Sequence, residues 1–164
     1  MAPETPDANP AISARLMLAT YIVGGLGIAA GMFTLQWSPP SLTIACLLAI
    51  GATGLLSFVR HSVFHRSDAA RMGWDYGRRN NFQIEVGLAN LAWGSVAVLA
   101  AALGWGLAVE SALFLVFAVY MLSVVVMNVT SNRAQGRRAP GPLIGAGAFG
   151  VMLLVVGIWG ISLA

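Results

Sequence analysis

Five long apolar stretches alternate with short polar segments along the chain. They cover residues 16–35, 41–59, 82–103, 111–129 and 143–163. A helix needs about 20 mostly apolar residues to cross a bilayer, and all seven prolines fall outside these stretches, as uninterrupted helices require. The pattern therefore predicts an all-α integral membrane bundle of five transmembrane helices over residues 14–164. A disordered cytoplasmic tail is expected over residues 1–13, which are polar and rich in proline.

The composition agrees with a membrane environment. Hydrophobic residues make up 58% of the chain and charged residues 9%, and the mean hydropathy is +0.79. Because water-soluble domains carry about 25% charged residues, a soluble fold of this size would lack the polar groups to cover its surface. The lipid bilayer is therefore the expected solvent and partner. The pI near 9.8 does not indicate nucleic acid as a partner, because no aromatic platform for stacking bases accompanies the basic residues.

The nine basic residues are all arginines and occur only in alternate connections. The positive-inside rule places such connections in the cytoplasm. It predicts a cytoplasmic N-terminus and an outside C-terminus. Trp37, Trp105 and Trp159 then fall near the outer interface, as in an aromatic belt. Apart from Arg15, the arginines are expected to set the topology or contact lipid headgroups: Arg60, Arg66, Arg71, Arg78, Arg79, Arg133, Arg137 and Arg138.

Small residues recur at helical spacing within the apolar stretches. Gly27 and Gly31 lie four residues apart in the first, and a stripe of small or polar residues follows one face of the third. Such stripes let helix backbones approach closely in lipid. We expect them to pack the helices of one bundle; an interface with another membrane protein or with a second copy is the alternative. The stripe in the third stretch comprises Gly87, Asn90, Gly94, Ala97 and Ala101.

Glu85 is the acidic residue that the apolar pattern places inside a span, about one turn into the third stretch. Ionisable residues inside membranes are functional candidates, so Glu85, with Gln83 beside it, is a candidate for binding a proton or cation. A structural interpretation is also open. Near the positive end of the helix dipole, the carboxylate would pair with Arg78 or Arg79 and hold the preceding loop.

Asn90 and Trp93 lie deeper in the same stretch and are further ligand candidates. Asn90 is expected to form a hydrogen bond with a neighbouring helix. The indole N–H of Trp93 needs an acceptor when buried, and Tyr120 and Ser123 of the fourth stretch are possible partners. A polar contact in the bundle core and a ligand-lined cavity both fit these residues.

His61 and His65 are four residues apart at the cytoplasmic end of the second stretch. A continued α-helix would place both on one face, where Glu85 or Asp68 would complete a three-ligand metal site. Histidines at the level of the lipid headgroups, without metal, are the alternative interpretation.

Common soluble chemistries are excluded. The chain has no phosphate-binding P-loop, no dinucleotide glycine fingerprint and no Gly-x-Ser-x-Gly motif. It has no lysine for a Schiff base, and its one cysteine, Cys46, lies in an apolar stretch. No cofactor is expected.

Residues 72–94 resemble a family of small bacterial integral membrane proteins of unknown function. The resemblance rests on Gly73-Trp74, on Phe82-Gln83-Ile84-Glu85-Val86-Gly87, and on Asn90 and Gly94 further on. Between these two blocks this chain has Asp75-Tyr76-Gly77-Arg78-Arg79 where the family pattern has a proline and Gly-Ser. The resemblance implies a multi-span membrane protein and no activity, and it draws attention to Gln83, Glu85 and Asn90.

Three functions remain open from the sequence. The first is a non-enzymatic accessory or structural membrane component that acts through its helix faces. The second is a small proton- or cation-coupled transporter centred on Glu85. The third is an intramembrane metal-binding protein that uses His61, His65 and Glu85.

Overall fold

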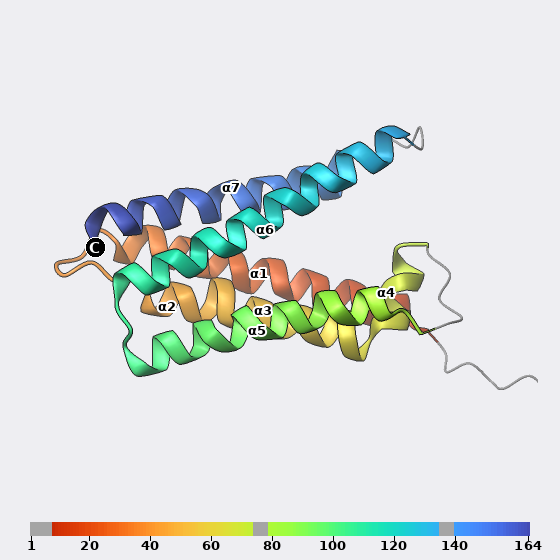
Figure 1. The fold of residues 1–164 in the computed structure, drawn as a ribbon, viewed down its shortest axis with the longest axis horizontal. Helices are drawn as coiled ribbons and strands as arrows, with labels where there is room; N and C mark the ends of the chain where they lie inside the picture. Colours follow the sequence, from red (N-terminus) through yellow and green to blue (C-terminus); the bar gives the residue numbers. More distant parts are fainter. Residues whose placement is uncertain (1–7, 74–78, 135–139) are drawn as a thin grey trace, which may run out of the picture.

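A computed structural model of the chain describes residues 8–73, 79–134 and 140–164, with side chains except those of 131–142. Every regular element in these ranges is a helix (Figure 1). Five helices are long and apolar enough to cross a membrane. The predicted all-α bundle of five spans is confirmed to this extent.

Four spans are single α-helices, and the second is a composite. The single helices are α1 (Pro10–Thr34), α5 (Asn81–Leu103), α6 (Leu107–Ala134) and α7 (Pro140–Leu163). The second span runs without a break through α2 (Thr43–Ala45), η1 (Cys46–Ala52), α3 (Thr53–Phe58) and η2 (Val59–Val63), and α4 (His65–Arg71) follows it.

Four of the five spanning helices begin earlier than their apolar stretches, whereas the second begins two residues later, at Thr43. The Asn9 side chain accepts a hydrogen bond from Ala11 N at 3.0 Å and caps α1, whose first residue is Pro10. The predicted tail over residues 1–13 is therefore wrong from residue 10 onward; its residues 1–7 lie outside the described part. α6 begins at Leu107, so Glu110 also lies inside a span, and Glu85 is not alone there. Hydropathy misses such first turns because a charged residue, Arg15 in α1 and Glu110 in α6, separates them from the apolar run.

Two π-helical segments, η1 and η2, change the course of the second span. In η2, Phe64 N donates to Val59 O at 3.0 Å, the i→i+5 bond of a π-turn. Phe64 then leaves helical geometry at φ −101° and ψ 31°, and α4 starts in a new direction. The α-helix expected to continue through His61 and His65 is therefore wrong.

Small residues pack the second span between α1 and α5. A Cβ on Gly27 would lie 2.4 Å from Ala49 N, and one on Gly54 would lie 2.8 Å from Gly94 Cα. Gly87 has equally little room beside Ser62. Such approaches require glycine, so these stripes bind the helices of one bundle together, as the first interpretation of the sequence predicts.

α6 and α7 form a hairpin that packs along most of its own length. Gly150 and Gly157 of α7 let Leu122 and Leu115 of α6 approach. The hairpin covers the core at one end, but toward residue 134 it rises away from α4 and α5 (Figure 1). Its inward-facing residues join the buried core formed with α1, the second span and α5, which includes Ile28, Cys46, Ile50, Phe114, Phe117, Leu153 and Val156.

The bundle has two chemically different ends. The start of α1, α4 and the start of α5 meet at one end, which we call the arginine end (Figure 1). The loop after α1, the turn between α5 and α6, and the C-terminus lie at the other, which we call the Glu110 end. Trp37 and Trp105 are exposed at the Glu110 end.

Candidate functional site

Asp68 is the centre of a buried polar cluster at the arginine end. Its side chain is fully buried, although α4 is a short surface helix. Buried carboxylates are stable only when cations and hydrogen-bond donors surround them. The donors come from α1, η2, α4 and α5, and with Asp68 they form what we call the Asp68 cluster: Ser13, Arg60, His61, Asp68, Arg71 and Gln83.

One carboxylate oxygen of Asp68 receives a hydroxyl and guanidinium groups. Ser13 Oγ donates to Oδ1 at 2.5 Å. Arg71 donates to the same oxygen from Nε at 3.1 Å and from Nη2 at 3.0 Å. Arg60 Nε lies further off, at 3.9 Å. Charge-assisted hydrogen bonds of this kind are about twice as strong as neutral ones, so Oδ1 ties α1 and η2 to α4.

The other oxygen faces His61 and Gln83. His61 Nδ1 lies 3.0 Å from Asp68 Oδ2, and Gln83 Nε2 donates to the same oxygen at 3.2 Å. Arg60 Nη2 is 2.6 Å from His61 Nε2, and since a guanidinium only donates, Nε2 must accept. The proton of the neutral ring is therefore on Nδ1. It points at Asp68 Oδ2 and at Gln83 Oε1, which is 2.7 Å away.

The cluster keeps Asp68 ionised. Burial alone would raise the pKa of the carboxyl group, but the hydrogen bonds from His61 and Ser13 and the charge of Arg60 outweigh it. The pKa of Asp68 is therefore held far below its ordinary value. Arg60 and Arg71 bring two positive charges to one negative charge.

Local structure explains how distant residues meet here. Asn80 caps α5 by accepting from Gln83 N at 3.1 Å, which fixes the first turn of the helix with Gln83 facing inward. The turn at Phe64 brings α4 back beside η2, and the extra turn of α1 before residue 16 carries Ser13 to Asp68. Asn9 N also donates to Ser67 Oγ at 3.0 Å.

Gln83 and Glu85, predicted as neighbours in one site, face in different directions. Gln83 is buried in the Asp68 cluster, whereas Glu85 is exposed. Two residues along an α-helix are about 200° apart around its axis, so both cannot face the bundle. Ion pairs among the described residues all involve Asp68, and Arg79 is exposed. The expected pairing of Glu85 with Arg79 is not formed, and Arg78 lies outside the described residues.

The histidines are not brought together as metal ligands. His61 is occupied by Arg60, Asp68 and Gln83, whereas His65 Nδ1 lies 3.0 Å from Ser62 O. His65 Nε2 is buried without a hydrogen-bond partner in the described part of the chain. Within that part, no three His, Cys, Asp or Glu side chains are placed to hold a metal ion.

Asn90 and Trp93 both face α6. Asn90 Nδ2 donates to Val86 O of its own helix at 2.7 Å, and the Asn90 side chain also lies within hydrogen-bonding reach of the Tyr120 hydroxyl of α6. Trp93 packs on Tyr120, with ring centroids 4.6 Å apart, and on Phe117. Its buried Nε1 has no hydrogen-bond partner among the described residues, so the acceptor expected from Tyr120 or Ser123 is not supplied.

The remaining arginines contribute less. Arg66 is half-buried, and its Nε has no partner among the described residues. The side chain of Arg133 and all of Arg137 and Arg138 lie outside the described part, so their expected role as topology signals stays a prediction.

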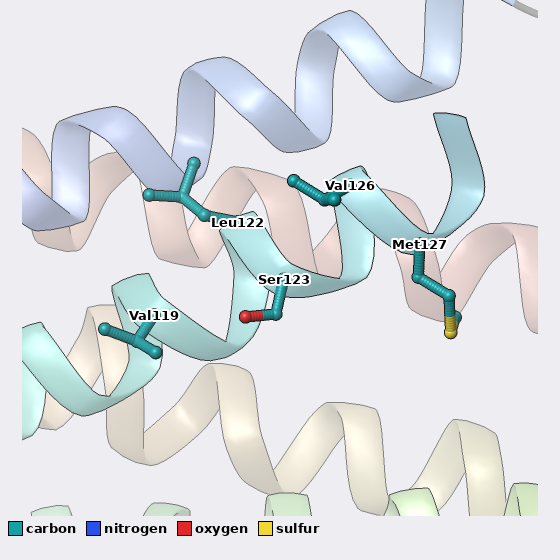
Figure 2. Close-up of a pocket in the computed structure, with 5 residues that line it drawn as sticks. All are labelled: Val119, Leu122, Ser123, Val126 and Met127. Atoms are coloured by element: carbon teal, nitrogen blue, oxygen red, sulfur yellow. The ribbon is translucent and has the colours of Figure 1, made fainter. Parts of the chain in front are cut away.

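The hollows described on the surface are apolar. The larger, of about 470 Å³, lies along α6 and is lined by Val119, Leu122, Ser123, Val126 and Met127 (Figure 2). Ser123 contributes its only polar side chain. A second groove, between α1 and α7, is lined mainly by small and apolar residues. Neither groove includes a residue of the Asp68 cluster.

Glu110 was missed as a candidate because it precedes the fourth apolar stretch. It lies one turn into α6, is 1% exposed, and its Oε1 accepts from Thr43 Oγ1 at 2.9 Å. The signal for its position is in the sequence: Gly104 and Gly106, both with positive φ, form the turn after which a helix begins at once.

Comparisons with known proteins give a family and no activity. No curated protein and no solved structure matches the chain. A family profile described as a family of unknown function (DUF6790) matches residues 14–163, which cover all five spans. The chain therefore belongs to the DUF6790 family.

Proposed function

We propose that this protein is a non-enzymatic accessory or structural component of a bacterial plasma membrane, which acts through contacts of its helix faces. The observation that carries the proposal is the way the Asp68 cluster is filled. Both carboxylate oxygens are occupied by side chains of the same chain, and the carboxylate has no exposed surface.

Catalysis requires a reactive group that a substrate can approach. In the Asp68 cluster the carboxylate of Asp68 is held in ion pairs. Both nitrogens of the His61 imidazole are occupied, one by Arg60 and the other by Asp68. Such an arrangement fixes the relative positions of α1, η2, α4 and α5. It supports a structural role for the polar residues that the sequence singles out as candidates.

The helix faces are the other part of the proposal. α6 exposes Val119, Val126 and Met127, which line the groove in Figure 2. Lipid chains or the helices of another membrane protein match such a surface, because packing rather than hydrophobicity drives association in lipid.

The orientation is part of the same proposal. The arginine end is placed in the cytoplasm and the Glu110 end outside, because basic residues are retained on the cytoplasmic side. A reporter that is active only outside the cytoplasm, fused after Ala164, is expected to be active. The same reporter fused after Gly73 is expected to be inactive, and the opposite pattern contradicts the orientation.

The accessory role is tested by purification from native membranes under mild detergent. We expect a second membrane protein to co-purify in stoichiometric amount. Bulky substitution of the α6 face, Val119→Trp with Val126→Trp, should release it, whereas Leu18→Trp on the exposed face of α1 serves as control. A lone monomer from native membranes, with no partner captured by cross-linking, contradicts the accessory role.

A further inference from the structure

Glu110 is an ionisable group deep in the bundle at the end opposite the arginines. Its side chain is 1% exposed, and its hydrogen-bond donor among the described side chains is the hydroxyl group of Thr43. Thr43 in turn contacts the half-buried Ser41, with the two hydroxyl oxygens 3.3 Å apart. Ser111, the next residue, is fully buried, and its Oγ has no partner in the described part.

Among the described residues, no cation forms an ion pair with Glu110. Residues 16–59, 80–132 and 139–164 contain no Arg, Lys or His. These ranges include every connection at the Glu110 end. The nearest arginine along α6 is Arg133, 23 residues further on, which is about 35 Å along a helix. Asp68 at the other end is paired with two arginines. The two buried carboxylates of the described residues therefore differ in that one has cationic partners and the other has none.

Burying a carboxylate without a cation costs free energy. Inside a membrane, this cost either lowers the stability of the fold or is offset by a bound ion. The local groups suit an ion. Carboxylate and hydroxyl oxygens are hard ligands, which favour hard cations over soft metals. The carboxyl ends of α1, α5 and α7 also lie at this end, and their last carbonyl groups carry partial negative charge, whereas the first turn of α6, which holds Glu110, contributes a partial positive charge but no full cation.

We propose that Glu110, with the Thr43 hydroxyl beside it, binds a small monovalent cation of the Na⁺ type, which enters from the Glu110 end. The bound ion supplies the positive charge that the sequence lacks there. It joins α6 to the second span, as Arg60 and Arg71 join η2 and α4 at the arginine end. The inference goes beyond the accessory role and does not depend on it.

The test uses the purified full-length protein in detergent with Na⁺ as the probe. Thermal unfolding is followed while NaCl replaces choline chloride at constant ionic strength, and ²²Na⁺ binding is measured directly. We expect the unfolding temperature to rise with Na⁺ and to saturate, with about one Na⁺ bound per chain. No saturable ²²Na⁺ binding by the wild-type protein overturns the proposal.

Two substitutions and a control assign the site. Glu110→Gln keeps the shape and removes the charge, and it should abolish both the binding and the Na⁺ dependence. Thr43→Val removes one ligand and should raise the half-saturating Na⁺ concentration several-fold. Glu85→Gln removes an exposed carboxylate from the same bundle and should respond to Na⁺ like the wild type. Unchanged Na⁺ binding in Glu110→Gln rules out this site, and if that variant does not fold, Thr43→Val decides.

A proton is the competing occupant. The control is a pH series in choline chloride. Acidification that gives the full stabilisation, with no further effect of Na⁺, shows that a proton alone fills the site and overturns the proposal.

Discussion

Ser13 and Asp68 are joined by a hydrogen bond of 2.5 Å between elements 55 residues apart in the chain. Ser13 Oγ also accepts from Arg71 Nε at 3.1 Å, so one hydroxyl group bridges the carboxylate and its guanidinium partner. Through this contact the first turns of α1 belong to the polar interior of the protein. The contact links the predictions for the Asp68 cluster to the position of α1.

Asp68→Asn is expected to destabilise the bundle by about 3 kcal/mol, because it leaves two partly buried guanidinium groups without their buried counter-charge. Unfolding in detergent, followed by circular dichroism, measures the change. Glu85→Gln is the matched control and should shift stability by less than about 0.5 kcal/mol, as expected for an exposed side chain. Equal stabilities of the two variants would show that the cluster does not hold the fold.

The contribution of Asp68 to stability should depend on pH in a defined direction. Its pKa is lower in the folded protein than the value of about 3.9 expected when unfolded. The unfolded carboxyl group therefore takes up its proton first, and the stabilisation is complete above about pH 5 and is lost as the pH falls through 4 and below. The difference in unfolding temperature between wild type and Asp68→Asn should shrink between pH 6 and 3. A constant difference contradicts the assignment.

Gly27→Ala and Gly25→Ala form a matched pair on α1. A Cβ at Gly27 would lie 2.4 Å from Ala49 N, a backbone atom that cannot move alone, whereas nothing lies within 4 Å at Gly25. Gly27→Ala should cost about 1–3 kcal/mol or more, because α1 must separate from η1. Gly25→Ala should be neutral or slightly stabilising, since alanine favours the helix. Equal effects in an unfolding titration would mean that α1 and η1 are not in this contact.

Trp93→Phe should keep the stability within about 1 kcal/mol of the wild type. Phenylalanine retains the aromatic contacts with Tyr120 and Phe117 and removes a buried N–H that has no partner among the described residues. Trp93→Ala leaves a cavity and should cost about 3–5 kcal/mol. A large loss in Trp93→Phe would reveal an acceptor for the indole N–H, such as a ligand or an ordered water.

The five spans could be predicted because a run of about 20 apolar residues is itself the property that a membrane selects. The stripes at Gly27 and Gly87 were predictable for a similar reason, since a helix has a fixed period. Their partners, Ala49 and Ser62, depend on how the helices cross and came only from the structure.

The polar site was only partly predictable. Gln83 and His61 were candidates, but their meeting point, Asp68, sits in a short helix whose direction depends on the π-turn of η2 and on Phe64. No hydropathy pattern encodes that turn. Glu85 was a candidate because of its depth in the third stretch. The period of the helix places its side chain on the exposed face. Glu110 escaped notice because residues 104–110 were assigned to the connection before the fourth stretch, although it is the more deeply buried carboxylate of the two.

The order of the chain has a consequence for biosynthesis. Each partner that the structure shows for Asp68 lies at or before Gln83, and the hairpin of α6 and α7 comes later. A nascent chain that has inserted three spans already holds all the charges and donors of the cluster. The ribosome would therefore release the hairpin onto a half in which the Asp68 cluster is already complete, and two fragments divided after Leu103 should reassemble when they are expressed together.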